Sequence, residues 1–187
     1  MIRLSNPSLP AFGGIPTRVC KNTRGWQCAG VQINLVNRQR RVRLDARRLA
    51  RLADASLAES CLYAGDGRCV LKKVALVEIA VVSDAVIARV HRQFMNVPGP
   101  TDVITFEHGE IVVSADTARV QAAEQGHGVT EELALYIIHG LLHLNGWNDI
   151  EPRERAGMHR AQERIWRRVL SAEVLKNQPC IVSRKKV

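Results

Sequence analysis

The sequence predicts an α+β fold, in which helices cover a single mixed sheet. Segments with the apolar pattern of strands alternate with segments that have the pattern of helices, and two of the strands are close enough to form a hairpin. In addition, the helix expected from about residue 130 is apolar on nearly every side, which is typical of a helix buried in the core. We therefore expect one sheet, with that helix packed against it.

The first half of the domain predicts two strands and two helices. Residues 31–35 alternate apolar and polar side chains, as expected of a half-buried strand. Residues 45–62 predict a helix because their apolar side chains form one stripe. Residues 74–82 are apolar and rich in β-branched side chains, which favours a strand. Ser83 can cap a second helix, which runs to about Phe94.

The second half predicts a hairpin and three more helices. Residues 102–106 and 110–113 are two short strands, and their close spacing indicates a hairpin. Ser114 can cap a third helix and Thr130 a fourth, because serine and threonine accept hydrogen bonds from the first turn. The highly charged segment 151–170 predicts an amphipathic last helix, which brings the expected number to about five.

We expect one folded domain, residues 31–172, between two extensions. Residues 1–30 contain three prolines and no acidic residue. We favour a flexible extension or a start codon assigned too early over an organelle leader, because the prolines would break an amphipathic helix. Residues 173–187 are expected to form a loose basic tail.

The charge balance indicates anionic partners. Lysine and arginine number 27 against 18 acidic residues, which gives a net charge of +9. Nucleic acid is the first candidate partner and a membrane surface the second. Aromatic residues make up only 4% of the chain, so a surface that binds single strands mainly by stacking bases is hard to build. No apolar stretch is long enough to cross a bilayer, and no membrane partner is expected.

The five cysteines form no Cys-x-x-Cys pair, and their odd number argues against a complete disulfide framework. We therefore expect reduced thiols in a cytoplasmic protein. Some of them can be buried, since a free cysteine packs like a small apolar residue.

A metal site is predicted by two histidines one helical turn apart. His139 and His143 share a helix face, with Cβ atoms about 5–6 Å apart. Gly146 allows the chain to leave the helix, and Asp149 can return a carboxylate to the same cation. Three protein ligands with a vacant fourth position are typical of catalytic zinc. A purely structural histidine pair, and Asp149 as the N-terminal cap of the next helix, are the competing interpretations.

The run His139–Trp147 resembles the motif of the YbeY family of rRNA-maturation endoribonucleases, over about residues 31–170. Further segments that resemble the family are Pro100–Phe106, Gly109–Ser114 and Glu124–Gly126 ahead of Glu132–Ala134. The chain departs from the family at three positions: Asn148 replaces an Asp, Asp149 replaces the third His ligand, and Met95 stands where an Arg is common. An aspartate oxygen binds zinc at about the distance of a histidine nitrogen.

The spacing is also similar to that of the metzincin metalloproteases. Those proteases carry a glutamate after the first histidine, which takes a proton from the metal-bound water. Gly140 stands at that position here and cannot act as a base. Peptide hydrolysis by that route is therefore disfavoured.

The resemblance implies a four-stranded mixed sheet with one antiparallel strand, and a zinc-dependent endoribonuclease for single-stranded RNA. It further implies one Zn²⁺ per chain on His139, His143 and Asp149, a role in rRNA 3′-end maturation and ribosome quality control, and the small ribosomal subunit as a partner. The alternative is a non-catalytic ribosome-assembly factor with a structural metal, which Met95 supports.

The catalytic base is not visible in the sequence. The attacking group would be a metal-bound water, and Thr101 and Asp102 are the candidates to orient water or phosphate, although they can equally hold their loop by local hydrogen bonds. His108 is of interest if its loop borders the cleft. The arginines of the segment 38–43 are most simply a solvated face, but would steer RNA if they lined the metal cleft.

Overall fold

The computed structural model describes residues 15–16, 30–65 and 67–177, with side chains from residue 30 to 174 apart from residue 66. Most of the extension 1–30 and residues 178–187 of the tail predicted for 173–187 lie outside the described residues, and residues 173–177 belong to the last helix instead of a loose tail. The division of the chain into a domain and two extensions therefore stays a prediction.

The described residues contain five strands and five helices. The strands are β1 Ile15–Pro16, β2 Gln32–Asn37, β3 Leu76–Val82, β4 Val103–Phe106 and β5 Glu110–Ser114. The helices are α1 Ala46–Ser60, α2 Asp84–Met95, α3 Ala115–Gln125, α4 Val129–Leu144 and α5 Pro152–Asn177. Each element predicted from residue 31 onward is present, with shifts of its ends. The largest shift is in α5, which runs beyond residue 170.

The sheet has the strand order β1-β2-β3-β5-β4. β2, β3 and β5 are parallel, and β4 joins β5 antiparallel through the predicted hairpin. The four-stranded mixed sheet with one antiparallel strand is thereby confirmed. The two-residue β1 adds a further antiparallel strand beside β2, which the sequence pattern did not predict.

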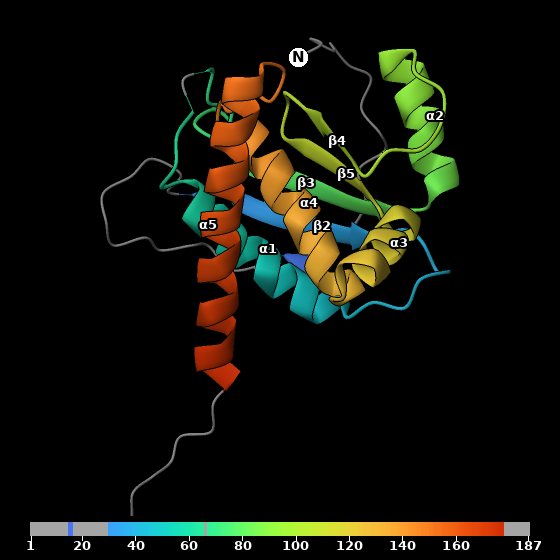
Figure 1. The fold of residues 1–187 in the computed structure, drawn as a ribbon, viewed down its shortest axis with the longest axis horizontal. Coiled ribbons are helices and arrows are strands. Elements are labelled where there is room, and N and C mark those ends of the chain that lie inside the picture. Colours follow the sequence, from blue (N-terminus) through green and yellow to red (C-terminus); the bar gives the residue numbers. More distant parts are fainter. Residues whose placement is uncertain (1–14, 17–29, 66, 178–187) are drawn as a thin grey trace, which may run out of the picture.

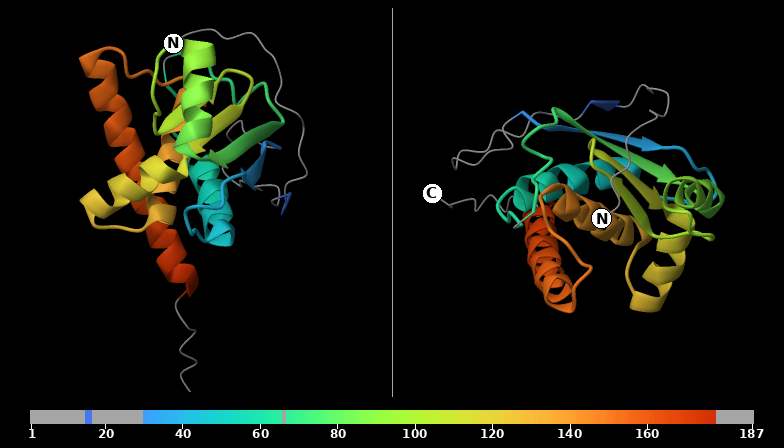
Figure 2. Two further views of the ribbon diagram at one scale, coloured as in Figure 1. Left: turned by 90° about the vertical axis from the view of Figure 1, so that its right-hand side faces the viewer. Right: turned by 90° about the horizontal axis from the view of Figure 1, so that it is seen from above.

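Helices cover the two faces of the sheet unequally. α1, α4 and α5 form the larger core with one face, where Val77, Ile79 and Val81 of β3 point (Figures 1 and 2). The alternate residues Ala80 and Val82 point to the opposite face, where they pack in a smaller cluster with Ile87 of α2 and its neighbours. The alternation follows from the two-residue period of a strand.

α4 lies inside the larger core, as its composition predicts. Leu133, Ile137, Ile138, Leu141 and Leu142 are each 0% exposed. A helix enclosed on so many sides has little freedom to move, so side chains at its margin are held on a rigid support.

The three predicted caps have different outcomes. Ser83 is the cap residue of α2, but its side chain accepts no hydrogen bond from the first turn of the helix. The Ser114 hydroxyl accepts a hydrogen bond from Thr117 N at 3.2 Å, as expected of a cap. Thr130 does not cap α4, because the helix begins earlier with Gly128 as its cap residue. The Glu131 carboxylate accepts a hydrogen bond from Gly128 N at 3.0 Å, so the start of the helix is stabilised at Gly128 and not at Thr130. The Thr130 hydroxyl instead accepts from Asp45 N at 3.4 Å.

Arg48 connects the three helices of the larger core. Its guanidinium on α1 donates to Glu131 of α4 at 2.8 Å and to both carboxylate oxygens of Glu173 of α5 at 2.9 Å. The Gly128 N–H, with Arg48 as the second cause, lowers the pKa of Glu131. The ion pairs hold the far end of α5 against α1 and α4, so the position of α5 along α4 is fixed.

The two described cysteines differ in state. Cys69 is a free thiol, and Cys61 is disulfide-bonded, so the expectation of reduced thiols is wrong for Cys61. Among the described helices, none combines the length and the apolar character that a bilayer crossing demands.

Candidate metal centre

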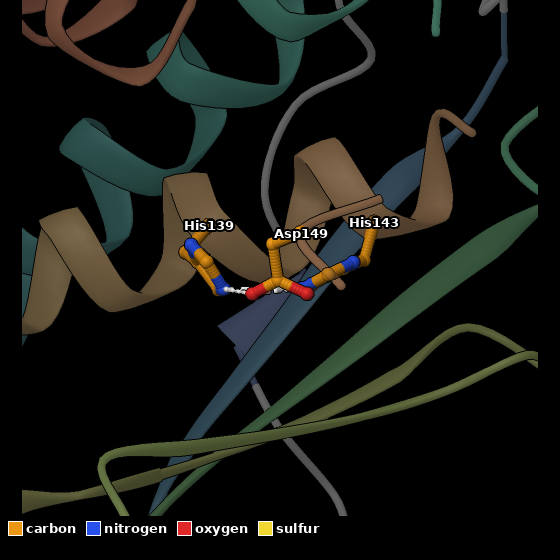
Figure 3. Close-up of side chains that lie close together, drawn as sticks. All are labelled: His139, His143 and Asp149. Carbon is orange, nitrogen blue, oxygen red and sulfur yellow. Dashed lines mark hydrogen bonds and ion pairs between the residues drawn. The ribbon is translucent and has the colours of Figure 1, made fainter. Parts of the chain in front are cut away.

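Three side chains from α4 and the bend after it meet at one point (Figure 3). The Nε2 atoms of His139 and His143 lie 3.1 Å apart. Oδ2 of Asp149 lies 3.6 Å from the first and 3.8 Å from the second. The structure thus brings together the three ligands that the sequence predicts, in an arrangement that could hold a metal ion.

The Nδ1 atom of each imidazole forms a hydrogen bond that orients the ring. Nδ1 of His143 lies 3.2 Å from the main-chain oxygen of Trp147, and Nδ1 of His139 lies 3.1 Å from Oε1 of Gln162 on α5. A carbonyl oxygen can only accept, so each Nδ1 carries the proton and donates it. Each Nε2 is then left with a lone pair, the form of imidazole that binds a metal.

The spacing of the three atoms fits a transition-metal ion. Two nitrogens at about 2.0–2.1 Å from a tetrahedral zinc lie about 3.3 Å apart, and a carboxylate oxygen lies at a similar distance from each. The observed 3.1, 3.6 and 3.8 Å bracket that value. Two facing lone pairs repel one another unless a cation lies between them, so the donor set fits a bound ion.

The centre is open on one side. The side chains of His139, His143 and Asp149 keep 24%, 21% and 38% of their surface exposed. Burial, with the neighbouring His139 as the second cause, lowers the pKa of His143, so its neutral form prevails at neutral pH. Exposure of this kind matches a centre that keeps a position for water or substrate, whereas structural zinc sites are closed.

The bend that follows α4 is fixed by contacts with a distant segment. Gly146 has φ +90°, and its backbone packs directly on Gly65 and Gly67. Gly67 N donates to Gly146 O at 2.9 Å, and Val70 N donates to Leu144 O at 2.7 Å. The segment 65–71 therefore satisfies carbonyl groups at the end of α4 that the helix itself leaves free.

Asn145 fastens the same bend to α1. Its amide donates to Ser60 O at 2.8 Å and to Tyr63 O at 2.7 Å, and its oxygen accepts from Cys69 Sγ at 3.0 Å. Trp147 adds a hydrogen bond from its indole N–H to Tyr63 O at 2.8 Å. These hydrogen bonds fix the path of the chain between the end of α4 and Asp149.

Asp149 is held from the other side by α5. Nε of Arg155 donates to the main-chain oxygen of Asp149 at 2.9 Å, and its Nη2 donates to Ile150 O at 3.2 Å. Among the described hydrogen bonds, none runs from the first turn of α5 to the carboxylate of Asp149. The contacts thus favour the ligand interpretation over the helix cap.

Gly140 lets α4 approach the sheet closely beside His139. A Cβ there would lie 2.9 Å from Cγ2 of Ile111 and 3.0 Å from Oγ1 of Thr105. A residue of any other type would push the helix away from β4 and β5. This position therefore serves packing, and it supplies no acid or base.

Gly140→Ala is expected to destabilise the protein by about 1–3 kcal/mol, because the added methyl group overpacks the contact with Ile111. Gly157→Ala is the matched control in α5, where a Cβ meets Trp147 only at 3.4 Å. Alanine favours a helix by about 1 kcal/mol over glycine, so the control should be neutral or stabilising. Urea unfolding of both variants measures the difference, and equal effects would contradict the packing argument.

The other candidate residues lie elsewhere. The Thr101 hydroxyl donates to the Asp102 carboxylate at 2.9 Å, which also accepts from Val103 N at 2.8 Å. Within the described part of the chain, no contact joins either residue to the three ligands, so their catalytic role stays a prediction. His108 pairs with Glu110 at 3.2 Å, and Glu110 points away from α4 because its neighbour Ile111 faces that helix.

The arginine segment 38–43 lies at the wrong end of α4 to steer RNA to the metal. It follows β2, where Arg38 N donates to Val81 O, and the chain then meets the start of α4 through Asp45 and Thr130. The fourteen-residue span from Thr130 to His143 corresponds to about 20 Å of helix. The solvated-face interpretation of these arginines is therefore favoured.

Two orienting residues were missed by sequence reasoning. Asn145 lies inside the motif, and its place at the end of a buried helix could have indicated a capping role. Gln162 lies on another helix, and nothing in its sequence neighbourhood indicates that it meets His139.

The comparisons with known proteins agree on one family. The family model for Endoribonuclease YbeY matches residues 34–170. A curated Endoribonuclease YbeY of a Synechococcus strain is 40% identical over 99 residues, which cover 45% of this chain and 60% of that protein. One from Micrococcus luteus is 34% identical over 108 residues (49% and 69%), and one from Mycobacterium tuberculosis is 37% identical over 100 residues (43% and 56%).

A solved structure supports the fold. The solution structure of TM1509 from Thermotoga maritima superposes with a TM-score of 0.51 at 24% identity, covering 83% of this chain and 99% of that one. The sequence matches span 60%, 69% and 56% of the three curated relatives. Since the family model matches well over half of the chain, with the metal-site motif inside the matched residues, this chain belongs to the YbeY family.

Proposed function

We propose that the protein is a zinc-dependent endoribonuclease that cleaves single-stranded RNA. The observation that carries the proposal is the convergence of His139, His143 and Asp149, with Nε2 atoms 3.1 Å apart and one side exposed. The curated relatives, which carry the name Endoribonuclease YbeY, supply the reaction class. Two imidazoles and one carboxylate are a donor set that suits zinc.

When bound, the metal supplies Lewis acidity toward water and toward a phosphoryl oxygen. The residues of this chain supply the rest. His139 and His143 present unprotonated Nε2 atoms, because Gln162 and the Trp147 carbonyl fix the proton on each Nδ1. Asp149 contributes one negative charge, which offsets part of the charge of a divalent ion. Gly140 lets the helix that carries the two histidines lie close to β4 and β5.

RNA is the substrate class that the charge favours. The chain carries a net charge of +9, which attracts phosphate backbones. Single-stranded RNA offers flexible phosphodiesters that can reach a centre open on one side, whereas a duplex is stiff. We further propose a role in rRNA 3′-end maturation and ribosome quality control in the cytoplasm, with the small ribosomal subunit as the partner.

A non-catalytic ribosome-assembly factor with a structural metal is the second candidate. Met95, the last residue of α2, favours it, because many family members carry an arginine there. Exposure of the metal ligands argues against it, since a structural ion is usually enclosed.

Cleavage by the His143→Ala variant separates the two candidates. With a fluorescent single-stranded RNA, the rate should fall about a thousandfold or more, because one of three metal ligands is lost. Binding of the RNA and the circular dichroism spectrum should stay close to those of the wild-type protein.

His91→Ala is the control for the loss of a histidine, since His91 of α2 bonds to Gly99 O, far along the chain from the metal ligands. It should cleave at the wild-type rate. Cleavage that persists in His143→Ala would overturn the metal chemistry, and a wild-type protein that binds RNA without cutting it would favour the assembly factor.

A further inference from the structure

A large cavity is lined by the bend that leads to Asp149. It has a volume of about 790 Å³, within the range of ligand-binding pockets. The loop that contains Gly65 and Gly67 forms one wall and the first turns of α5 form another. The side chains that matter for the argument are those of Arg68, Trp147, Asn148, Arg153, Glu154 and Arg160.

The three arginines of this cavity are free to bind an anion. Some arginines of the protein are engaged, such as Arg48 with Glu131 and Glu173, and Arg155 with the carbonyl groups of Asp149 and Ile150. Among the described residues, no side-chain hydrogen bond or ion pair involves Arg68, Arg153 or Arg160, which all border the cavity. Guanidinium groups that line one cavity and have no side-chain partner favour phosphate as the ligand.

The cavity also has room for a flat ring beside Trp147. The indole N–H of Trp147 is already bonded to Tyr63 O, which fixes the ring, and its edge faces Gly157. A Cβ at Gly157 would lie 3.4 Å from Cζ3 of Trp147, in ordinary contact, so only a larger side chain there would fill the space beside the indole. Any of the four nucleobases can stack on such a ring, because each base has a flat π-face.

The cavity is linked to the metal centre through the chain itself. The carbonyl of Trp147 orients His143, and Asn148 precedes the ligand Asp149. Arg160 also borders a second cavity of about 350 Å³, which includes Gln162, the residue that orients His139. The larger cavity is thus lined by residues that directly precede the ligand Asp149, and it shares Arg160 with the cavity at Gln162.

We propose that the cavity is a nucleotide-binding subsite for the same RNA strand, next to the nucleotides at the metal. The inference rests on the proposed function for its substrate class. The arginines bind phosphates, Trp147 stacks on a base, and the Glu154 carboxylate accepts a hydrogen bond from a ribose 2′-hydroxyl.

Two variants test the subsite by different physical means. Arg153→Gln/Arg160→Gln removes positive charge, and Gly157→Leu fills the space beside Trp147 at a helical position. The affinity of the metal-loaded protein for a ten-nucleotide oligouridylate with phosphorothioate linkages, which resist hydrolysis, is measured by fluorescence anisotropy. Both variants should raise Kd about tenfold at 0.1 M salt.

The salt dependence distinguishes the two effects. The double arginine variant should flatten the slope of log K against log salt by about 1.4, since each phosphate contact on a single strand contributes about 0.7. Gly157→Leu should leave the slope nearly unchanged. The double variant Arg89→Gln/Arg92→Gln, which removes the same two charges from exposed positions of α2, should leave Kd unchanged. The metal content of all variants should match that of the wild-type protein, and none should have a lower melting temperature.

The results separate this subsite from the nuclease itself. A raised Kd in both variants supports the subsite even if the wild-type protein proves unable to cleave RNA. An unchanged Kd in both variants overturns the subsite, even if His143→Ala abolishes cleavage and so upholds the proposed reaction.

Discussion

Replacing His139 by alanine is expected to remove the divalent ion from the protein. Wild-type protein that has been loaded with zinc and dialysed should retain one equivalent per chain, and His139→Ala should retain none. The variant keeps only His143 and Asp149, and two donors bind zinc far more weakly than three. We expect the affinity to fall by about a thousandfold or more, because ligand bonds provide most of the binding free energy.

Elemental analysis gives the stoichiometry, and thermal unfolding gives an independent measurement. A ligand present at about a thousand times its Kd stabilises the folded state by about 4 kcal/mol. Added zinc should therefore raise the melting temperature of the wild-type protein and of His91→Ala, but not that of His139→Ala. A folded wild-type protein that remains free of metal after exposure to zinc would contradict the whole arrangement.

The second large effect is expected at Asp149, where ligand and helix cap can be told apart by substitution. Asp149→Ala should lose the metal as His139→Ala does. Asp149→Asn should also lose most of it, because a neutral amide is a poor zinc ligand, although asparagine caps helices as well as aspartate. Asp149→His should retain one equivalent, since an imidazole provides a donor at about the same distance from the ion.

Metal content and melting temperature of the three variants measure the difference. If Asp149 were only a cap, Asp149→Asn would behave like the wild-type protein and Asp149→His would be the impaired variant. The observed distances of 3.6 and 3.8 Å from Oδ2 to the two imidazoles lead us to expect the opposite order.

Local patterns in the sequence were sufficient to predict most of the fold. The strands and helices from residue 31 onward follow from apolar periodicity, which is visible within a few residues. The burial of α4 follows from its composition, and the pairing of His139 with His143 follows from the helical repeat. In each case the signal and the structure it predicts occupy the same short stretch of chain.

Contacts between distant segments were not visible in the sequence. Gln162 meets His139 because Arg48 and the bend after α4 fix α5 along α4. Thr130 lost its expected role to Glu131, which bonds to Gly128 and to Arg48 at once. The sequence does not reveal which end of the sheet the arginines near residue 40 occupy, and hence whether they can attract RNA to the metal centre. Only the tertiary arrangement decides such questions.

The contact between Gly146 and the segment 65–71 has a consequence for how the protein tolerates change. Connections between helices and strands usually accept insertions, since few groups depend on them. Here, backbone N–H groups from that connection complete the end of the helix that carries both histidines. An insertion in this connection would thus be expected to weaken metal binding, although none of its residues is a metal ligand.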